Sequence, residues 1–144
     1  MICKLIAIAT ALLLAACGGG SVDAKPPPLD TAAPAQWSAI ATQAVANDAA
    51  FAPAGLPPMV ESSIFAMAFS AAHVALNAID RRYKPYLTDT SAPTADHGAA
   101  VATAMHDVLK ATLPSQAAYL DGKYATTLAA VAAGDARIAG VALG

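Results

Sequence analysis

The sequence is poor in charged, aromatic and sulfur-containing residues. Charged residues occupy 12% of the 144 positions, aromatic residues occupy 6%, and the formal net charge is -2. Disordered chains carry more charge than this, and nucleic-acid-binding domains carry a larger basic surface. The length predicts one folded domain at most, and the small number of basic residues argues against a nucleic-acid partner.

Both cysteines lie near the N-terminus, at positions 3 and 17, so the rest of the chain can form no disulfide and no cysteine-ligated metal site. Lys4 is followed by twelve apolar or small residues that end at Ala16. This is the layout of a signal peptide, and twelve residues are too few to cross about 30 Å of hydrocarbon. We therefore predict that residues 1–16 are a signal peptide and are removed.

The four residues Leu14-Ala15-Ala16-Cys17 resemble the lipobox of bacterial lipoproteins. That resemblance implies a diacylglyceryl group on Cys17 and attachment to the membrane of the cell envelope, on the periplasmic side. The following Gly- and Pro-rich segment, up to residue 33, has the composition of a tether. The residue after Cys17 is not aspartate. In lipoproteins of enteric-type bacteria, the absence of aspartate at this position goes with sorting to the outer membrane. The alternative is an ordinary secretory signal cut nearby.

Residues 34–144 show no alternation of period two, whereas apolar residues recur at spacings of three and four. The pattern predicts an all-α domain of about four helices and a shortened fifth. The expected helices run from Pro34 to about Phe51, from Val60 to Ile79, from a Thr94 cap to Lys110, from Gln116 to Ala132, and from an Asp135 cap to the end of the chain. The first of them is predicted to bury one stripe, formed by Trp37, Ile40, Ala41, Ala44 and Val45.

The expected second helix is apolar on nearly every face, which predicts that it forms the centre of the core. Ser70, His73 and Asn77 interrupt it and argue against a membrane span. The fifth helix is predicted to bury Ile138, Val141 and Ala142. It is only about two turns long, so it needs a packing partner that the sequence does not clearly identify.

Several segments resemble the N-terminal helical region of bacterial vanadium-dependent haloperoxidases and of the type 2 phosphatidic acid phosphatase superfamily. The matching segments are 37–41, 66–79, Arg82-Tyr83-Lys84-Pro85-Tyr86, Ala104-Met105-His106-Asp107-Val108-Leu109, Leu120-Asp121 and 140–144. The resemblance departs at Ser63, where such proteins often have arginine, and at Val74, where they often have aspartate.

The resemblance implies a helical bundle that holds vanadate or phosphate among Lys, Arg, a Ser-Gly-His segment and a terminal His. Those motifs are missing here: Ser115 is followed by Gln116, and the chain has only three arginines. Several convergent cations are needed to hold such an anion. The sequence therefore predicts a non-catalytic N-terminal portion that binds no cofactor. In the proteins it resembles, the catalytic half follows this portion.

The remaining polar candidates are interpreted as structural. His73 and Asn77 share a helix face at a spacing of four and are expected to form a hydrogen-bonded core pair. The basic residues Arg81, Arg82 and Lys84 are expected to complement the dipole at the end of the second helix.

Two other histidines are given no catalytic role. His97 is expected to be exposed and idle. His106 and Asp107 are not expected to meet, because adjacent residues point about 100° apart on a helix.

Two classes of function remain open from the sequence. The first is a membrane-anchored lipoprotein with a truncated, non-catalytic domain. The second is a complete small helical lipoprotein that binds a partner through an apolar face. An enzyme completed by a separate chain is a third alternative. A helical protein partner, or the missing C-terminal half, is the expected partner besides the membrane at Cys17.

Overall fold

The computed structural model describes residues 31–48, 55–85 and 87–144, and this part of the chain is all-α, as predicted. The predicted signal peptide, Cys17 and most of the tether lie outside the described residues. A single 3₁₀ turn, Pro114–Gln116, joins the third helix to the fourth. The α-helices are α1 (Ala32–Ala46), α2 (Pro58–Ile79), α3 (His97–Thr112), α4 (Ala117–Ala130) and α5 (Asp135–Leu143).

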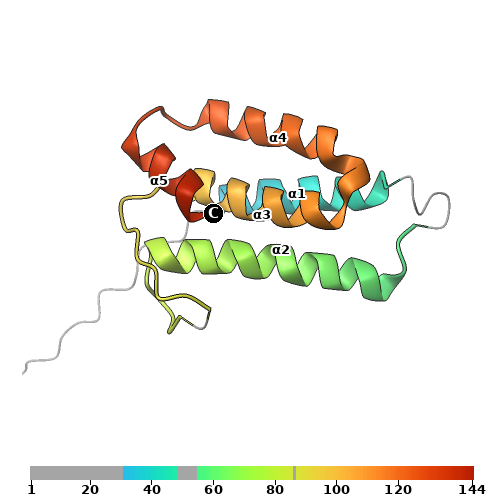
Figure 1. Ribbon diagram of the computed structural model, residues 1–144, viewed down its shortest axis with the longest axis horizontal. Helices are drawn as coiled ribbons and strands as arrows, with labels where there is room; N and C mark the ends of the chain where they lie inside the picture. The colour runs from blue at the N-terminus through green and yellow to red at the C-terminus, as the bar shows by residue number, and fades with distance from the viewer. Residues whose placement is uncertain (1–30, 49–54, 86) are drawn as a thin grey trace, which may run out of the picture.

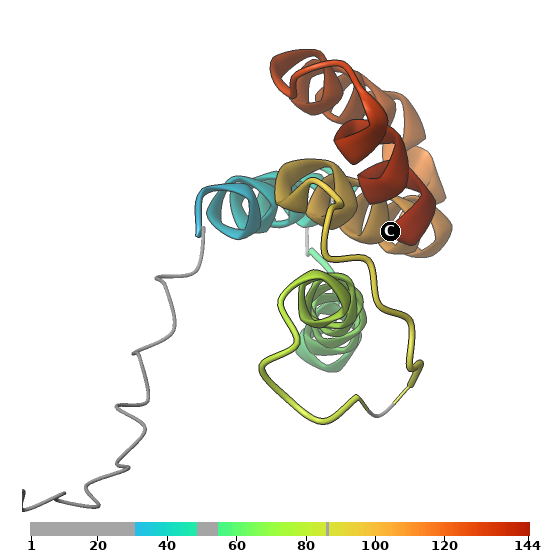
Figure 2. The ribbon, with the colours of Figure 1, turned by 90° about the vertical axis from the view of Figure 1, so that its left-hand side faces the viewer.

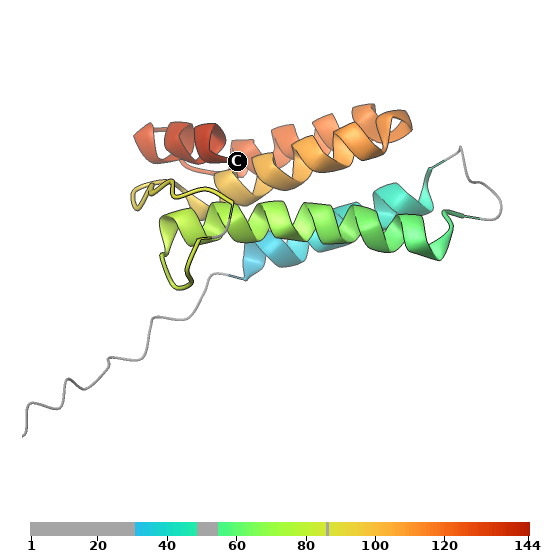
Figure 3. The same ribbon diagram turned by 60° about the horizontal axis from the view of Figure 1, so that its bottom comes forward.

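The centre of the bundle is α3, not α2 as the hydropathy predicted. It lies between α2 and α4 in Figure 1, and the end-on view in Figure 2 shows α1 beside it. Every residue from Ala99 to His106 is buried, which happens only when a helix is covered on all sides. Its many alanines let four other helices approach it closely. Figure 3 shows α2 lying along one side of the bundle.

The predicted stripe of α1 is confirmed. Its five members are all buried, and the Trp37 side chain has no exposed surface. They pack against the middle of α3, where Val101, Met105 and Leu109 are also fully buried. The stripe residues are Trp37, Ile40, Ala41, Ala44 and Val45.

Several helix ends differ from the prediction, because hydrogen bonds that the apolar periodicity does not reveal determine them. The third helix is capped by Asp96, whose carboxylate accepts a hydrogen bond from the Ala99 amide at 2.8 Å, and not by Thr94. The first helix begins at Ala32 and ends at Ala46. After the end of α1, the side-chain amide of Gln116 donates to the Asn47 carbonyl at 3.0 Å. This hydrogen bond joins the end of α1 to the turn that follows α3.

The fifth helix finds its partner inside the chain, where it packs against the first half of α3. The expected face is wrong: Ile138 is 66% exposed, and the buried residue is Gly140. A β-carbon on Gly140 would lie 2.7 Å from the carbonyl oxygen of Asp96, so only glycine fits this approach. Asp135 is also not the cap, because Gly134, at φ 147°, precedes the helix. This φ is one that other residues rarely adopt.

Candidate functional site

The predicted pair of His73 and Asn77 is replaced by a different arrangement. Asn77 is buried and binds the turn that follows α2: its side-chain oxygen accepts from the Tyr83 amide at 2.9 Å, and its nitrogen donates to the Tyr83 carbonyl at 3.0 Å. His73 is exposed, and its ring lies 5.5 Å from that of Tyr83. The asparagine therefore fixes the path of the chain out of α2.

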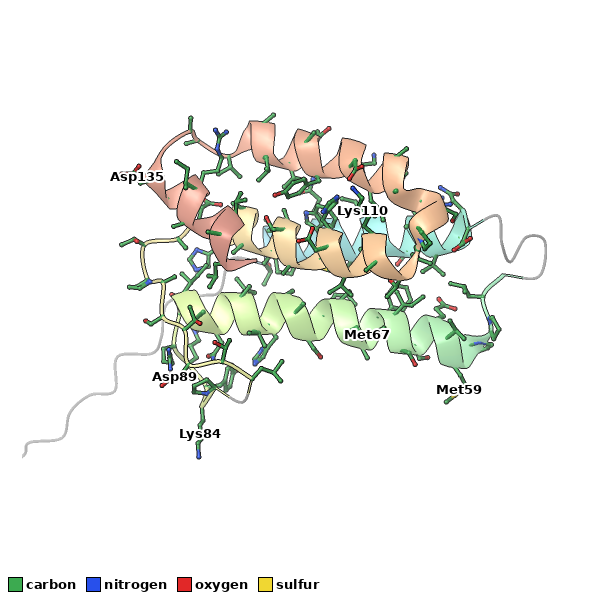
Figure 4. The ribbon with its side chains drawn as sticks, in the orientation of Figure 1. Met59, Met67, Lys84, Asp89, Lys110 and Asp135 are labelled. Carbon is green, nitrogen blue, oxygen red and sulfur yellow. The ribbon has the colours of Figure 1, made fainter. Side chains whose placement is uncertain are left out.

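The basic residues after α2 also differ from the prediction, because the helix ends at Ile79, before either arginine. Arg81 forms an ion pair with Asp89 and donates to the Thr90 carbonyl at 2.8 Å, so it closes the loop after α2. Lys84 is exposed and projects away from the bundle in Figure 4. The cavity among these residues has a volume of about 10 Å³, which holds no more than a single water molecule.

His97 is not idle. Its Nε2 atom lies 3.0 Å from a carboxylate oxygen of Asp80, and both side chains are partly exposed. This contact joins the end of α2 to the start of α3 across the loop. No spacing rule predicts this contact, because seventeen positions separate the two residues.

The most extensive polar cluster is centred on His106, a buried residue on the central helix. Its Nδ1 atom lies 2.7 Å from Asp107, and its Nε2 atom lies 2.8 Å from Asp121 on α4. The expectation that His106 and Asp107 do not meet is therefore wrong, since the carboxylate turns back toward the ring. Both ring nitrogens of His106 thus lie within hydrogen-bond distance of a carboxylate.

The ring of His106 is also packed between aromatic side chains. It stacks on Tyr124 at 4.4 Å between centroids and meets Trp37 nearly at a right angle at 6.4 Å. The Tyr124 hydroxyl lies 2.9 Å from the Thr103 hydroxyl on α3. The cluster thereby connects three helices, α1, α3 and α4, through one side chain.

Asp121 also contacts Lys110. The Lys110 ammonium donates to its carboxylate at 2.7 Å, and this hydrogen bond, followed by the one from His106, lowers the pKa of Asp121 below its usual value. The carboxylate is 49% exposed, so water screens part of the attraction. The charges of Lys110 and Asp121 are thus balanced within the chain.

This balance predicts a pH dependence of stability. A carboxyl group whose pKa is lower in the folded than in the unfolded state stabilises the fold above its unfolded pKa, and that contribution is lost as the pH falls through the folded pKa. We expect Asp121→Asn to lower the melting temperature at pH 6 and to have a smaller effect at about pH 3, below the ordinary pKa of an aspartate. Thermal unfolding of both proteins, followed by circular dichroism across this range, measures the difference. An equal effect at both pH values would contradict the assignment.

The described residues do not fit the vanadate or phosphate that the family resemblance implies. Two carboxylates flank His106, and they would repel an oxyanion. Arg81 is occupied by Asp89, and Arg137 donates to the Leu128 carbonyl at 3.3 Å on the opposite side of α3 from α2. The described part of the chain also contains no group of three or more His, Cys, Asp or Glu side chains placed to hold a metal ion.

A second feature is the outer face of α2, defined as the exposed positions on the side turned away from α3. Met59 is 80% exposed, Met67 47% and Phe69 41%. The hydroxyls of Ser62 and Ser63 donate to carbonyls of their own helix at 2.7 and 2.8 Å, which reduces their need for water. The face consists of Met59, Ser62, Ser63, Ala66, Met67, Phe69, Ser70 and His73.

No charged residue occurs between Glu61 and Asp80. By length and composition α2 could cross a membrane, and 39% of its most apolar window is buried in the bundle. The outer face of α2 therefore combines exposed apolar side chains with serines whose hydroxyls are bound within the helix. The sequence signal for it was present in the hydropathy of this segment, which we interpreted as a core position.

Comparisons of the chain with family models, with curated proteins and with solved structures found no match.

Proposed function

We propose that this protein is an exported bacterial lipoprotein, held at the cell envelope by acylated Cys17, and that its helical domain is a non-catalytic interaction module. The observation that carries the second part is the outer face of α2, which no helix in the described part of the chain covers. The core is complete without that face, since α3 is already enclosed by α1, α2, α4 and α5. An apolar surface that the fold does not need for its own stability is available for a partner.

The arrangement of the ionisable groups supports the absence of catalysis. A general acid or base needs an atom that can exchange a proton with the substrate. Both nitrogens of His106 face carboxylates of this chain, and His97 is bound to Asp80. The contact of His106 with Asp121 joins α3 to α4, and the contact of His97 with Asp80 joins the start of α3 to the end of α2, so both serve the packing of the bundle.

We also propose that the domain is related to the N-terminal helical part of vanadium-dependent haloperoxidases and type 2 phosphatidic acid phosphatases, without their catalytic half. Support comes from the motif residues themselves: Trp37, Met105 and His106 meet in the interior. Downstream DNA tests this relation, because a continuing frame that encodes the missing Ser-Gly-His and Arg motifs supports truncation, whereas its absence favours a complete small lipoprotein.

The lipid anchor is tested by Cys17→Ser. We expect the unaltered chain, made in a bacterial host, to incorporate an alkyne-labelled fatty acid and to remain in the membrane fraction after a carbonate wash. The variant lacks the thiol that accepts the lipid, so we expect no label and either an uncleaved precursor or release by the wash. Gel fluorescence and mass spectrometry of the N-terminus measure both results.

Ser21→Ala is the matched control, because it changes a nearby hydroxyl and leaves the lipobox intact. Equal labelling and equal retention of the Cys17 variant would contradict the lipoprotein assignment. Turnover of a phosphomonoester, or of bromide with vanadate and peroxide, by the purified protein would contradict the non-catalytic part.

A further inference from the structure

The chemistry of the outer face of α2 restricts the kind of partner that could bind there. The segment from 62 to 79 carries no formal charge, and its most apolar window has a mean hydropathy of 1.5. In Figure 4, Met59 and Lys84 project on the side that no other helix covers. Helices that lie in the interface of a lipid bilayer bury exposed apolar side chains of this kind at the boundary between headgroups and acyl chains.

We propose that the outer face of α2 rests on an anionic bilayer surface, in the plane of the membrane that holds Cys17. This inference rests on the proposed function, since it names the partner of the interaction module. The side chains of Met59 and Met67 enter the boundary of the acyl chains, and the helix remains in the interface because its opposite side is buried against α3.

The C-terminal end of α2 provides the second observation. Lys84 is exposed there beside Tyr83, which is 61% exposed, and Leu87, which is 67% exposed. Lysine and tyrosine side by side suit the headgroup region, where a cation meets lipid phosphate and an aromatic ring lies between water and acyl chains. The nearby acids are already bound: Asp89 pairs with Arg81, and Asp80 contacts His97.

The predicted anchor at Cys17 provides a third argument. Cys17 and Thr31 are fourteen residues apart, so the domain cannot move more than about 50 Å from the acylated residue. A tether of this length keeps the local concentration of membrane surface high, and a face of modest affinity is then occupied.

A second copy of the chain suits the face less well. A helix of 22 residues is about 33 Å long and about 10 Å wide, so face-to-face pairing of two such helices covers about 330 Å² on each. Stable protein interfaces bury about 800 Å² per partner. The area therefore favours a lipid surface, which does not depend on a large complementary partner.

The test uses the predicted mature chain from residue 17 with Cys17→Ser, which has no other thiol. Met67→Cys places one environment-sensitive fluorophore on the outer face of α2, and Thr126→Cys places it on the exposed side of α4. Vesicles of phosphatidylcholine with 30% phosphatidylglycerol are added at millimolar lipid, which replaces the concentration that the anchor supplies. We expect a blue shift and at least a threefold rise in emission at position 67 and no change at 126.

Co-sedimentation without a label gives an independent measurement. We expect Met67→Glu and Lys84→Glu each to lower the bound fraction at least fivefold, while Thr126→Glu leaves it unchanged and circular dichroism shows the same helix content in all three. Equal response at positions 67 and 126, equal binding to vesicles of phosphatidylcholine alone, or a shift that follows protein concentration instead of lipid would overturn the inference. The last result would identify a second copy. None of these results depends on acylation, so the lipoprotein assignment stands or falls separately.

Discussion

Gly140→Leu should detach α5 from the bundle and lower the free energy of unfolding by about 3 kcal/mol. A β-carbon at this position would lie 2.7 Å from the Asp96 carbonyl and 2.9 Å from the β-carbon of Ala99. The first obstacle is backbone at the capped start of α3, so it cannot move aside as a flexible side chain would. Once detached, the nine residues of α5 are too few to remain helical in water.

Urea denaturation measures the loss of stability, and hydrogen exchange locates it in residues 135–143. Gly122→Ala is the matched control, because this glycine lies in the exposed middle of α4 with no atom within 4 Å of an added β-carbon. That variant should be more stable by about 0.5–1 kcal/mol, because alanine favours the helix. Unchanged protection of α5 in Gly140→Leu would show that the close approach is not required.

His106→Ala should cost about 2–4 kcal/mol, since it removes the ring that joins α1, α3 and α4. The variant loses the stack on Tyr124 and the contact with Trp37, and it leaves a space in the interior. It also loses the hydrogen bonds to Asp107 and Asp121, but both carboxylates reach solvent and can be hydrated instead. Packing therefore accounts for most of the loss.

His106→Phe separates packing from hydrogen bonding, because it keeps a ring of similar shape and removes both donors. We expect it to lose about 1 kcal/mol, clearly less than the alanine variant. Chemical denaturation of the three proteins at pH 6 gives the comparison. If the phenylalanine variant were as unstable as the alanine variant, the two carboxylate contacts would be the dominant contribution.

The helical periodicity predicted the existence of five helices because each helix is a local structure. The stripe from Trp37 to Val45 follows from spacings of three and four, and the breaks near Pro57 and Pro114 follow from the geometry of proline. The helix ends were less predictable. The cap of α3 is Asp96, in the loop before the helix. The turn at Asn47 is held by a hydrogen bond from a side chain 69 positions away.

The candidate sites were harder to predict than the helices. His106 was recognised as a polar residue, but its partners Asp121 and Tyr124 belong to another helix, and no spacing rule joins α3 to α4. The role of α2 was misinterpreted for a similar reason. Hydropathy measures how apolar a helix is, but it does not say which helix the others surround.

The sequence by itself determined the all-α class, the approximate helices and the buried stripe of α1, because these depend on backbone preferences and on periodicity within one segment. Only the tertiary structure decided that α3 is central, that α5 packs against it through Gly140, and that α2 keeps an apolar outer face. The physical reason is that an alanine-rich helix has little to distinguish one side from another. Close approach of backbones, which involves residues distant in the chain, then decides which surfaces are buried.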